Sequence, residues 1–164
     1  MTASTASAPP SLAARVRRAA LLLGVLPTCA AILVITLGPT WLVADGLALV
    51  MTGLERSGST LDVGRVESLA NTAMFVPLGA SLGLAVRPRS WPLVALAGAA
   101  LSAAVELAQT RLPGRVPDVH DLVANTGGGL IGLAVAVALV AVAHLAALLV
   151  RISRPDRGRP LAVR

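Results

Sequence analysis

The sequence predicts an all-α membrane protein: a bundle of about four transmembrane helices plus one interfacial or re-entrant helix, with both termini in the cytoplasm. Three observations support this fold class. The 164 residues are 55% hydrophobic and only 13% charged, whereas about a quarter of the residues in a soluble domain carry charge. Several apolar runs approach or exceed the roughly 20 residues that a helix needs to cross a bilayer. The arginines flank these runs.

The N-terminal part predicts a tail followed by one span. Residues 1–14 are small and polar and lack apolar periodicity, which is typical of a disordered tail. An arginine-rich stretch then precedes an apolar run over residues 19–37, which is long enough to cross a membrane. Pro27 lies inside this run and predicts a kink, which membrane helices tolerate.

The next segment, residues 41–54, is apolar but short. About 14 residues are too few to cross a bilayer comfortably. Trp41 at its start suits a membrane interface, so we favour an interfacial or re-entrant helix over a fifth span. Residues 55–67 are then expected to form a polar loop.

Three further spans follow, at residues 68–86, 91–110 and 121–150. The last run is about 30 residues long, so its helix must tilt or project beyond the bilayer. Residues 151–164 are basic and are expected to form a cytoplasmic tail. The chain is therefore predicted to be one membrane domain, over residues 15–150, between two tails.

All the basic side chains are arginine, and their distribution predicts the orientation. Ten of the 14 lie just before the first span, in the turn between the second and third spans or in the C-terminal tail, and four fall on the other side. Because cytoplasmic segments carry an excess of arginine, both termini are expected in the cytoplasm. Topology therefore explains the net charge of +6 without nucleic-acid binding, for which two tryptophans and one phenylalanine offer little stacking surface.

With this topology, polar side chains from three separate spans meet near their outer ends. These residues are Asn71, Glu106, Gln109, Asp121 and Asn125. Glu106 and Gln109 are three residues apart, so they share one helix face. Asp121 and Asn125 are four residues apart and share a face in the same way. The convergence predicts a polar site at the outer edge of the membrane.

The start of the last span carries several further features. Asp118 is a candidate cap for this helix. His120 lies between Asp118 and Asp121, and we expect a solvated loop residue there, since two aspartates with one histidine are a weak signal for a metal site. Gly128 and Gly132 form a G-x-x-x-G pair, which lets a neighbouring helix approach closely.

Glu106 has two interpretations. An ionised carboxylate inside a membrane is costly, so Glu106 should be neutral or paired. It either forms a structural ion pair with Arg111 or Arg115, or serves as a general acid, a general base or a ligand-binding carboxylate in an outward cavity. Asn71 and Asn125 likewise fit hydrogen bonds that only hold helices together. The sequence leaves these interpretations open.

Three motifs within about residues 68–135 belong together. They read Asn71-x-x-x-Phe75-x-Pro77-Leu78-Gly79, then Glu106-x-x-Gln109, then Arg115-x-x-Asp118-x-x-Asp121-x-x-x-Asn125-x-Gly127. The combination resembles the VanZ-like family of bacterial membrane proteins. The resemblance implies a small multi-helix protein of the bacterial cytoplasmic (inner) membrane. The founding member of that family is associated with low-level resistance to teicoplanin, a lipoglycopeptide.

These observations define a candidate site in which Glu106 and Asp121 are the catalytic candidates. The binding candidates are Asn71, Gln109, Arg111, Arg115, Asp118 and Asn125. We expect the site to bind or modify the head group of a membrane lipid, a lipid-linked cell-wall precursor or a lipoglycopeptide, without a metal or cofactor. The alternative is a non-catalytic scaffold whose polar cluster only locks helix packing. A transporter is disfavoured because four spans show no internal repeat, and enzymatic activity and oligomeric state stay open.

Overall fold

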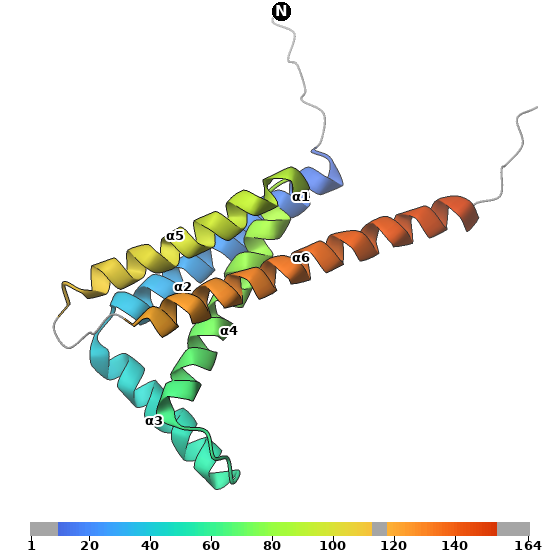
Figure 1. Cartoon of the computed structure of the whole chain (residues 1–164). Coiled ribbons are helices and arrows are strands. Elements are labelled where there is room, and N and C mark those ends of the chain that lie inside the picture. The colour runs from blue at the N-terminus through green and yellow to red at the C-terminus, as the bar shows by residue number, and fades with distance from the viewer. Residues whose placement is uncertain (1–9, 113–117, 154–164) are drawn as a thin grey trace, which may run out of the picture.

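The computed structural model describes residues 10–112 and 118–153, and these residues form helices joined by short connections. The longer helices are α1 (Leu12–Ala19), α2 (Leu26–Leu37), α3 (Thr40–Arg56), α4 (Val63–Ala85), α5 (Trp91–Gln109) and α6 (Val119–Ser153). A π-helical segment (Ala20–Val25) joins α1 to α2, and a short 3₁₀ turn (Pro88–Ser90) precedes α5. Figure 1 shows α4 crossing the bundle between the other long helices.

Four helical segments are long and apolar enough to cross a membrane. They are Leu12–Leu37, Val63–Ala85, Pro88–Gln109 and Val119–Ser153. The structure therefore confirms the all-α bundle with four candidate spans, and α3 is the additional helix that the sequence predicted. The sequence predicted a tail over residues 1–14, but α1 already begins at Leu12.

The start of α1 and its break have local causes. Ser11 caps the helix, since its Oγ accepts a hydrogen bond from the backbone N–H of Ala14 at 3.3 Å. The π-helical segment ends two residues before Pro27. Proline lacks an N–H and its ring collides with the carbonyl four residues earlier, and a widened turn accommodates this defect. A π-helical segment therefore lies just before Pro27, where the sequence predicted a kink.

The helix α3 and the first turns of α4 form a hairpin that leaves the bundle (Figure 1). No residue of α3 is buried. The helix α4 begins at Val63, five residues before the expected start at residue 68, because the carboxylate of Asp62 caps it by accepting from Arg65 N at 2.8 Å. Much of the predicted loop at residues 55–67 is therefore helical.

The core is built on close contact between α4 and α6, which cross each other while running in the same chain direction. A Cβ atom on Gly128 would collide with the carbonyl oxygen of Thr72, and one on Gly132 with that of Val76. Glycine at these two positions lets the backbones of the helices touch, as the G-x-x-x-G pair predicted.

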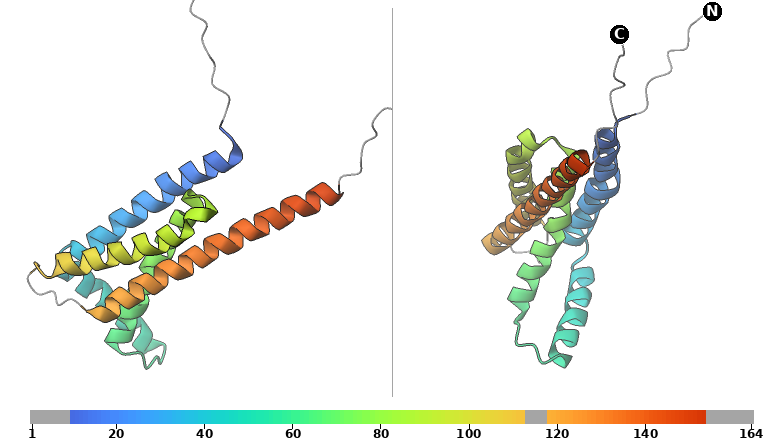
Figure 2. Two further views of the ribbon diagram at one scale, coloured as in Figure 1. Left: turned by 45° about the horizontal axis from the view of Figure 1, so that its top comes forward. Right: turned by 90° about the vertical axis from the view of Figure 1, so that its right-hand side faces the viewer.

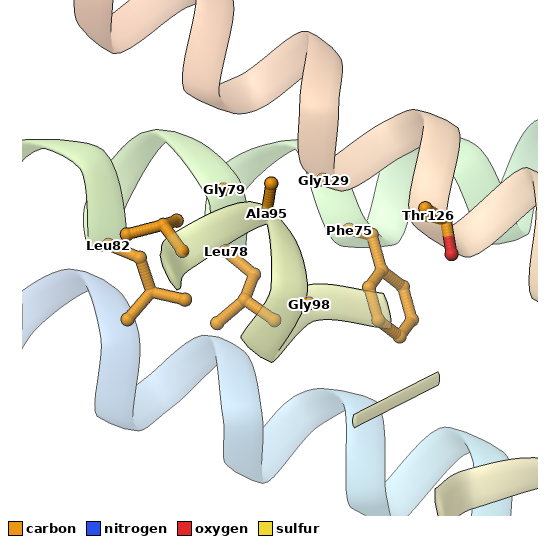
Figure 3. Close-up of a pocket in the computed structure, with 9 residues that line it drawn as sticks. Phe75, Leu78, Gly79, Leu82, Ala95, Gly98, Thr126 and Gly129 are labelled. Atoms are coloured by element: carbon orange, nitrogen blue, oxygen red, sulfur yellow. The ribbon is translucent and has the colours of Figure 1, made fainter. Parts of the chain in front are cut away.

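Apolar side chains fill the space beside this helix pair. Phe75 and Leu78 of α4 pack with Val25 and Ile32 of the first span. Figure 3 shows Phe75 and Leu78 beside α5, where they line a small gap next to Gly129. The gap has a volume of about 10 Å³, which holds one water molecule at most. It is part of the packed core and not a ligand site.

The helices place both described ends of the chain at one end of the bundle. The start of α1 and the last turn of α6 lie there, and α2 and α5 finish at the opposite end, where α6 begins (Figure 2). The 35 residues of α6 measure about 52 Å, longer than a bilayer core of about 30 Å. The far end of α6 extends past the other helices (Figure 2), and its tilt in a bilayer or projection beyond one stays a prediction.

Candidate functional site

Polar side chains gather at the end of the bundle where α5 ends and α6 begins. Within the described residues, four hydrogen bonds join segments there that are distant in the sequence. Five of the eight residues in these bonds, Asn71, Glu106, Gln109, Asp121 and Asn125, are those whose convergence the sequence predicted. The structure therefore brings them together at one end of the bundle, and each bond shows what its side chain does.

The first bond joins α4 to α6. Asn71 Nδ2 donates to Asp121 Oδ1 over 2.7 Å, and both side chains are half-buried. Asp121 lies in the first turn of α6, where the helix dipole stabilises a negative charge. Because Asn71 uses a donor and Asp121 uses one oxygen, the second oxygen of Asp121 remains as an acceptor.

The second bond joins α6 to α5 deeper in the bundle. Asn125 Nδ2 donates to Ser102 Oγ over 3.1 Å, and these side chains are 2% and 0% exposed. Oδ1 of Asn125 is buried and has no hydrogen-bond partner among the residues described. An unpaired buried carbonyl is costly, so Asn125 differs from the other members of the cluster.

The third bond joins α5 to the end of the first span. Gln109 Nε2 donates to the backbone oxygen of Thr36 over 3.1 Å, and both residues are buried. Thr36 is the last but one residue of α2, so its carbonyl lacks a partner within the helix. Gln109 therefore completes the C-terminus of α2, which is a structural role, and its contact with a ligand stays a prediction.

The fourth bond involves Glu106. Its Oε2 accepts a hydrogen bond from the backbone N–H of Asp118 over 3.1 Å. This contact fastens the beginning of α6 to the last turns of α5. In the described part of the chain, no ion pair joins Glu106 to Arg111, and Arg115 lies outside the described residues. The carboxylate thus has a backbone partner, which neither interpretation of the sequence included.

Asp118 and His120 form a unit at the first turn of α6. Asp118 Oδ1 accepts from His120 N at 2.8 Å and lies 2.7 Å from His120 Nδ1. Asp118 is therefore the predicted cap of α6. The backbone N–H of His120, followed by its side chain, holds the pKa of Asp118 below its ordinary value. The sequence predicted that His120 lies in a loop. Its side chain is exposed, but the residue belongs to the first turn of α6.

An open groove of about 550 Å³ lies beside this unit. Its lining comes from the start of α4 and the start of α6: Leu61, Asp62, Gly64, Arg65, Glu67, Ser68, Leu69, Asp118, His120 and Asp121. The four carboxylates and one arginine among them leave a net charge of −3 with neutral histidine. The groove can therefore accept hydrogen bonds and hold positive charge.

The α4 side of this groove is not among the predicted site residues, because the sequence predicts a polar loop over residues 55–67. A usable signal was present: Asp62 three residues before Arg65 is a capping position, and Glu67 is four residues before Asn71, on the same helix face. Arg111 is exposed and does not line the groove. Its role as a binding residue stays a prediction.

The described residues contain no group of three or more His, Cys, Asp or Glu side chains placed to hold a metal ion. The fold and the cluster define a multi-pass α-helical membrane protein with a polar site at one end of its bundle. A family model, VanZ/LLP1, matches residues 20–142. The chain belongs to this VanZ-like family, which confirms the resemblance read from the motifs. No curated protein and no solved structure matches the chain.

Proposed function

We propose that the groove between the starts of α4 and α6 binds the polar head group of a cell-envelope component. The observation that carries this proposal is a groove of about 550 Å³ whose wall includes four carboxylates. These four are half of the eight acidic residues of the chain, so negative charge is concentrated at this one groove.

The arrangement of the groove supports a ligand that is attached to a lipid. Leu61 and Leu69 lie in the same wall as the carboxylates, and Leu69 is 57% exposed. A molecule could place its head group against the carboxylates while its acyl chains stay in the bilayer. A phospholipid, a lipid-linked cell-wall precursor and a lipoglycopeptide such as teicoplanin all have this build.

The proposed orientation places the groove at the outer face of the cytoplasmic membrane. Ten of the 14 arginines lie in α1, in the turn before α5 or from residue 151 onward, and the positive-inside rule assigns these to the cytoplasm. The groove lies at the opposite end of α4. A membrane-impermeant maleimide should then label Asp62→Cys but not Arg89→Cys in intact cells, in a Cys29→Ser background; the reverse labelling would overturn the orientation.

Within this proposal Asp121 is the residue that meets the ligand. It lines the groove and keeps one carboxylate oxygen beyond its bond to Asn71. Glu106 is a positioning residue, because it acts through Asp118, which also lines the groove. A chemical step at Asp121 is the finer form of the proposal, with its free oxygen as general base toward a hydroxyl of the ligand.

The test compares Asp121→Asn and Glu67→Gln with wild type and a deletion strain. Both variants remove a charge from the groove, and the asparagine keeps an oxygen that can accept from Asn71. We expect normal yields of monodisperse protein and an envelope lipid and glycan profile, read by mass spectrometry, that matches the deletion. Glu55→Gln, an exposed residue of α3 outside the groove lining, is the control and should match wild type. A wild-type profile in both groove variants would overturn the proposal.

The four hydrogen bonds favour a second candidate, a scaffold without a ligand. Three side-chain amides, those of Asn71, Gln109 and Asn125, each donate one hydrogen bond to another helix. Such bonds are what a structural cluster requires. In that case the groove charges would have no role, and substitutions of the joining residues alone would change the phenotype, through reduced yield. The groove variants therefore separate the two candidates.

A further inference from the structure

The helix α6 has two opposite faces, and only one of them packs against the bundle. The packed face holds all of its buried residues, which are Asn125, Gly128, Gly132 and Ala136. The periodicity of a helix places a second set of residues on the opposite side, and every member of this set is exposed. We call this set the α6 seam; it consists of Leu130, Ala134, Val137, Ala141, His144 and Leu148.

The spacing of the α6 seam is that of a helix that packs against another helix. Its alternating steps of four and three residues average 3.5, the repeat of a coiled-coil interface. Ala134 and Ala141 are small side chains within the seam, which lets two membrane helices approach closely. No helix that the structure describes covers the seam, and the far end of α6 extends past the other helices (Figure 2). The seam is therefore open to another molecule.

His144 is a second, independent observation within the seam. Its side chain is exposed, and in the described part of the chain no hydrogen bond or ion pair reaches its ring. Six apolar residues separate it from Arg151, so it lies about 10 Å inside the end of this candidate span. Ionisable side chains inside a membrane are rare and are almost always paired. His144 therefore calls for a partner that the described residues do not supply.

We propose that two copies of this chain pair through the α6 seam, with the two His144 side chains hydrogen-bonded to each other. A neutral imidazole has one N–H donor and one ring nitrogen that accepts, so His144 is complementary to itself. Two copies in one membrane share their orientation, and a two-fold axis along the membrane normal brings both imidazoles together at the same depth. A single polar residue in an apolar seam also fixes the register of the pair.

Other occupants of the seam meet only part of this demand. Acyl chains of lipids cover apolar side chains but offer the imidazole neither a donor nor an acceptor. A helix of a different protein would need a polar residue at the depth of His144, which a second copy always has. Arg151 follows the seam at the end of the span, where salt and water screen the repulsion between two copies.

This pairing is independent of the proposed function, because none of the residues that line the groove belongs to the α6 seam. The groove lies at the start of α6, and His144 lies 23 residues beyond Asp121. The failure of either proposal therefore leaves the other standing.

The first experiment is disulfide cross-linking of the full-length protein in its membrane, with Cys29→Ser and one new cysteine. Ala141→Cys lies in the seam. Ala143→Cys is the matched control, since Ala143 is also exposed but lies about 200° around the helix. With a mild oxidant we expect a covalent dimer from Ala141→Cys and monomer from Ala143→Cys on a non-reducing gel. Equal cross-linking of the two would overturn the seam as the interface.

The second experiment measures pairing by energy transfer in liposomes as the protein is diluted with lipid. The dyes are attached to Ser153→Cys, an exposed position at the end of α6, in the Cys29→Ser background. We expect His144→Leu to weaken dimerisation about 3- to 15-fold, the effect of one hydrogen bond between membrane helices. His144→Asn offers a donor and an acceptor and should pair more strongly than the leucine variant. Because His144 is exposed, both variants should keep the helix content of wild type.

Three results would overturn the proposal. Wild type that stays monomeric at every dilution would show that lipid alone covers the seam. Dimerisation that is unchanged in His144→Leu would show that the imidazoles do not meet. A cross-link from Ala141→Cys to a different protein, without the covalent dimer, would assign the seam to a foreign partner.

Discussion

Glu106 accepts a hydrogen bond from the backbone of Asp118, so a carboxylate near the end of α5 holds the residue that caps α6. The contact spans 12 residues of sequence and sets where α6 begins. It also gives Asp118 and Asp121 a fixed position at the edge of the groove. The geometry at Glu106 therefore links the structural cluster to the proposed ligand site.

The role of Glu106 is tested by comparing two substitutions. Glu106→Gln keeps a side-chain oxygen that can accept from Asp118, so its free energy of unfolding should stay close to wild type. Glu106→Ala removes the acceptor and should lose about 1 kcal/mol, the usual net value of a hydrogen bond. Denaturant unfolding in detergent measures both. An equal loss of unfolding free energy in the two variants would contradict the hydrogen bond. A Glu106→Gln variant that is stable but has the envelope profile of the deletion strain would assign Glu106 a chemical role.

The bond between Asn71 and Asp121 should show energetic coupling. A double-mutant cycle with alanine at both positions is expected to give a coupling free energy of about 0.6–1.7 kcal/mol, which runs from the average to the largest value measured for hydrogen bonds between membrane helices. The matched cycle pairs Asn71 with Glu55, which is on another helix and exposed, and should give no coupling. Two additive single variants at Asn71 and Asp121 would show that the contact contributes nothing.

Two adjacent glycines of α6 make a sharp test of helix packing. Gly128→Ala places a methyl group against the carbonyl of Thr72, whereas Gly127 has open space around the same position. We expect Gly128→Ala to lower both the monodisperse yield and the free energy of unfolding. Gly127→Ala should raise the free energy of unfolding slightly, because alanine favours a helix by up to about 1 kcal/mol over glycine. Indistinguishable variants would contradict the close contact of α4 and α6.

The cap at Asp118 predicts a dependence of stability on pH. Its pKa in the folded protein lies below the ordinary 3.8, chiefly because the backbone N–H of His120 donates to the carboxylate. The charged form therefore stabilises the fold above pH 3.8, and this contribution is lost as the pH falls through the lowered pKa. Unfolding of wild type and Asp118→Ala should differ at neutral pH and converge in strong acid. A difference that grew on acidification would have the wrong sign.

Much of this arrangement was predictable, because it depends on helix periodicity and side-chain type. The four-residue spacing of Asp121 and Asn125 and of Gly128 and Gly132 indicated which faces meet, and the structure confirms contacts from those faces. The clustering of polar residues at one end followed from the direction of each span. These features need only the pitch of a helix and the thickness of a membrane.

Other features carry no such signal. The partner of Gln109 is the backbone carbonyl of Thr36, and every residue has a carbonyl. Ser102 pairs with Asn125, but a serine in an apolar run is common and rarely marks a contact. The groove depends on α4 beginning at Val63, and helix starts are the least certain boundaries to predict. Arg115, also predicted to bind, lies outside the described residues.

The most direct test of head-group binding measures what leaves the membrane with the protein. Wild type, the double variant Glu67→Gln/Asp121→Asn and the control Glu55→Gln are purified gently and compared by native mass spectrometry. We predict that one class of envelope molecule accompanies wild type and the control and is absent from the double variant at equal protein yield. The same molecules at the same occupancy in all three proteins would contradict a ligand site at the groove.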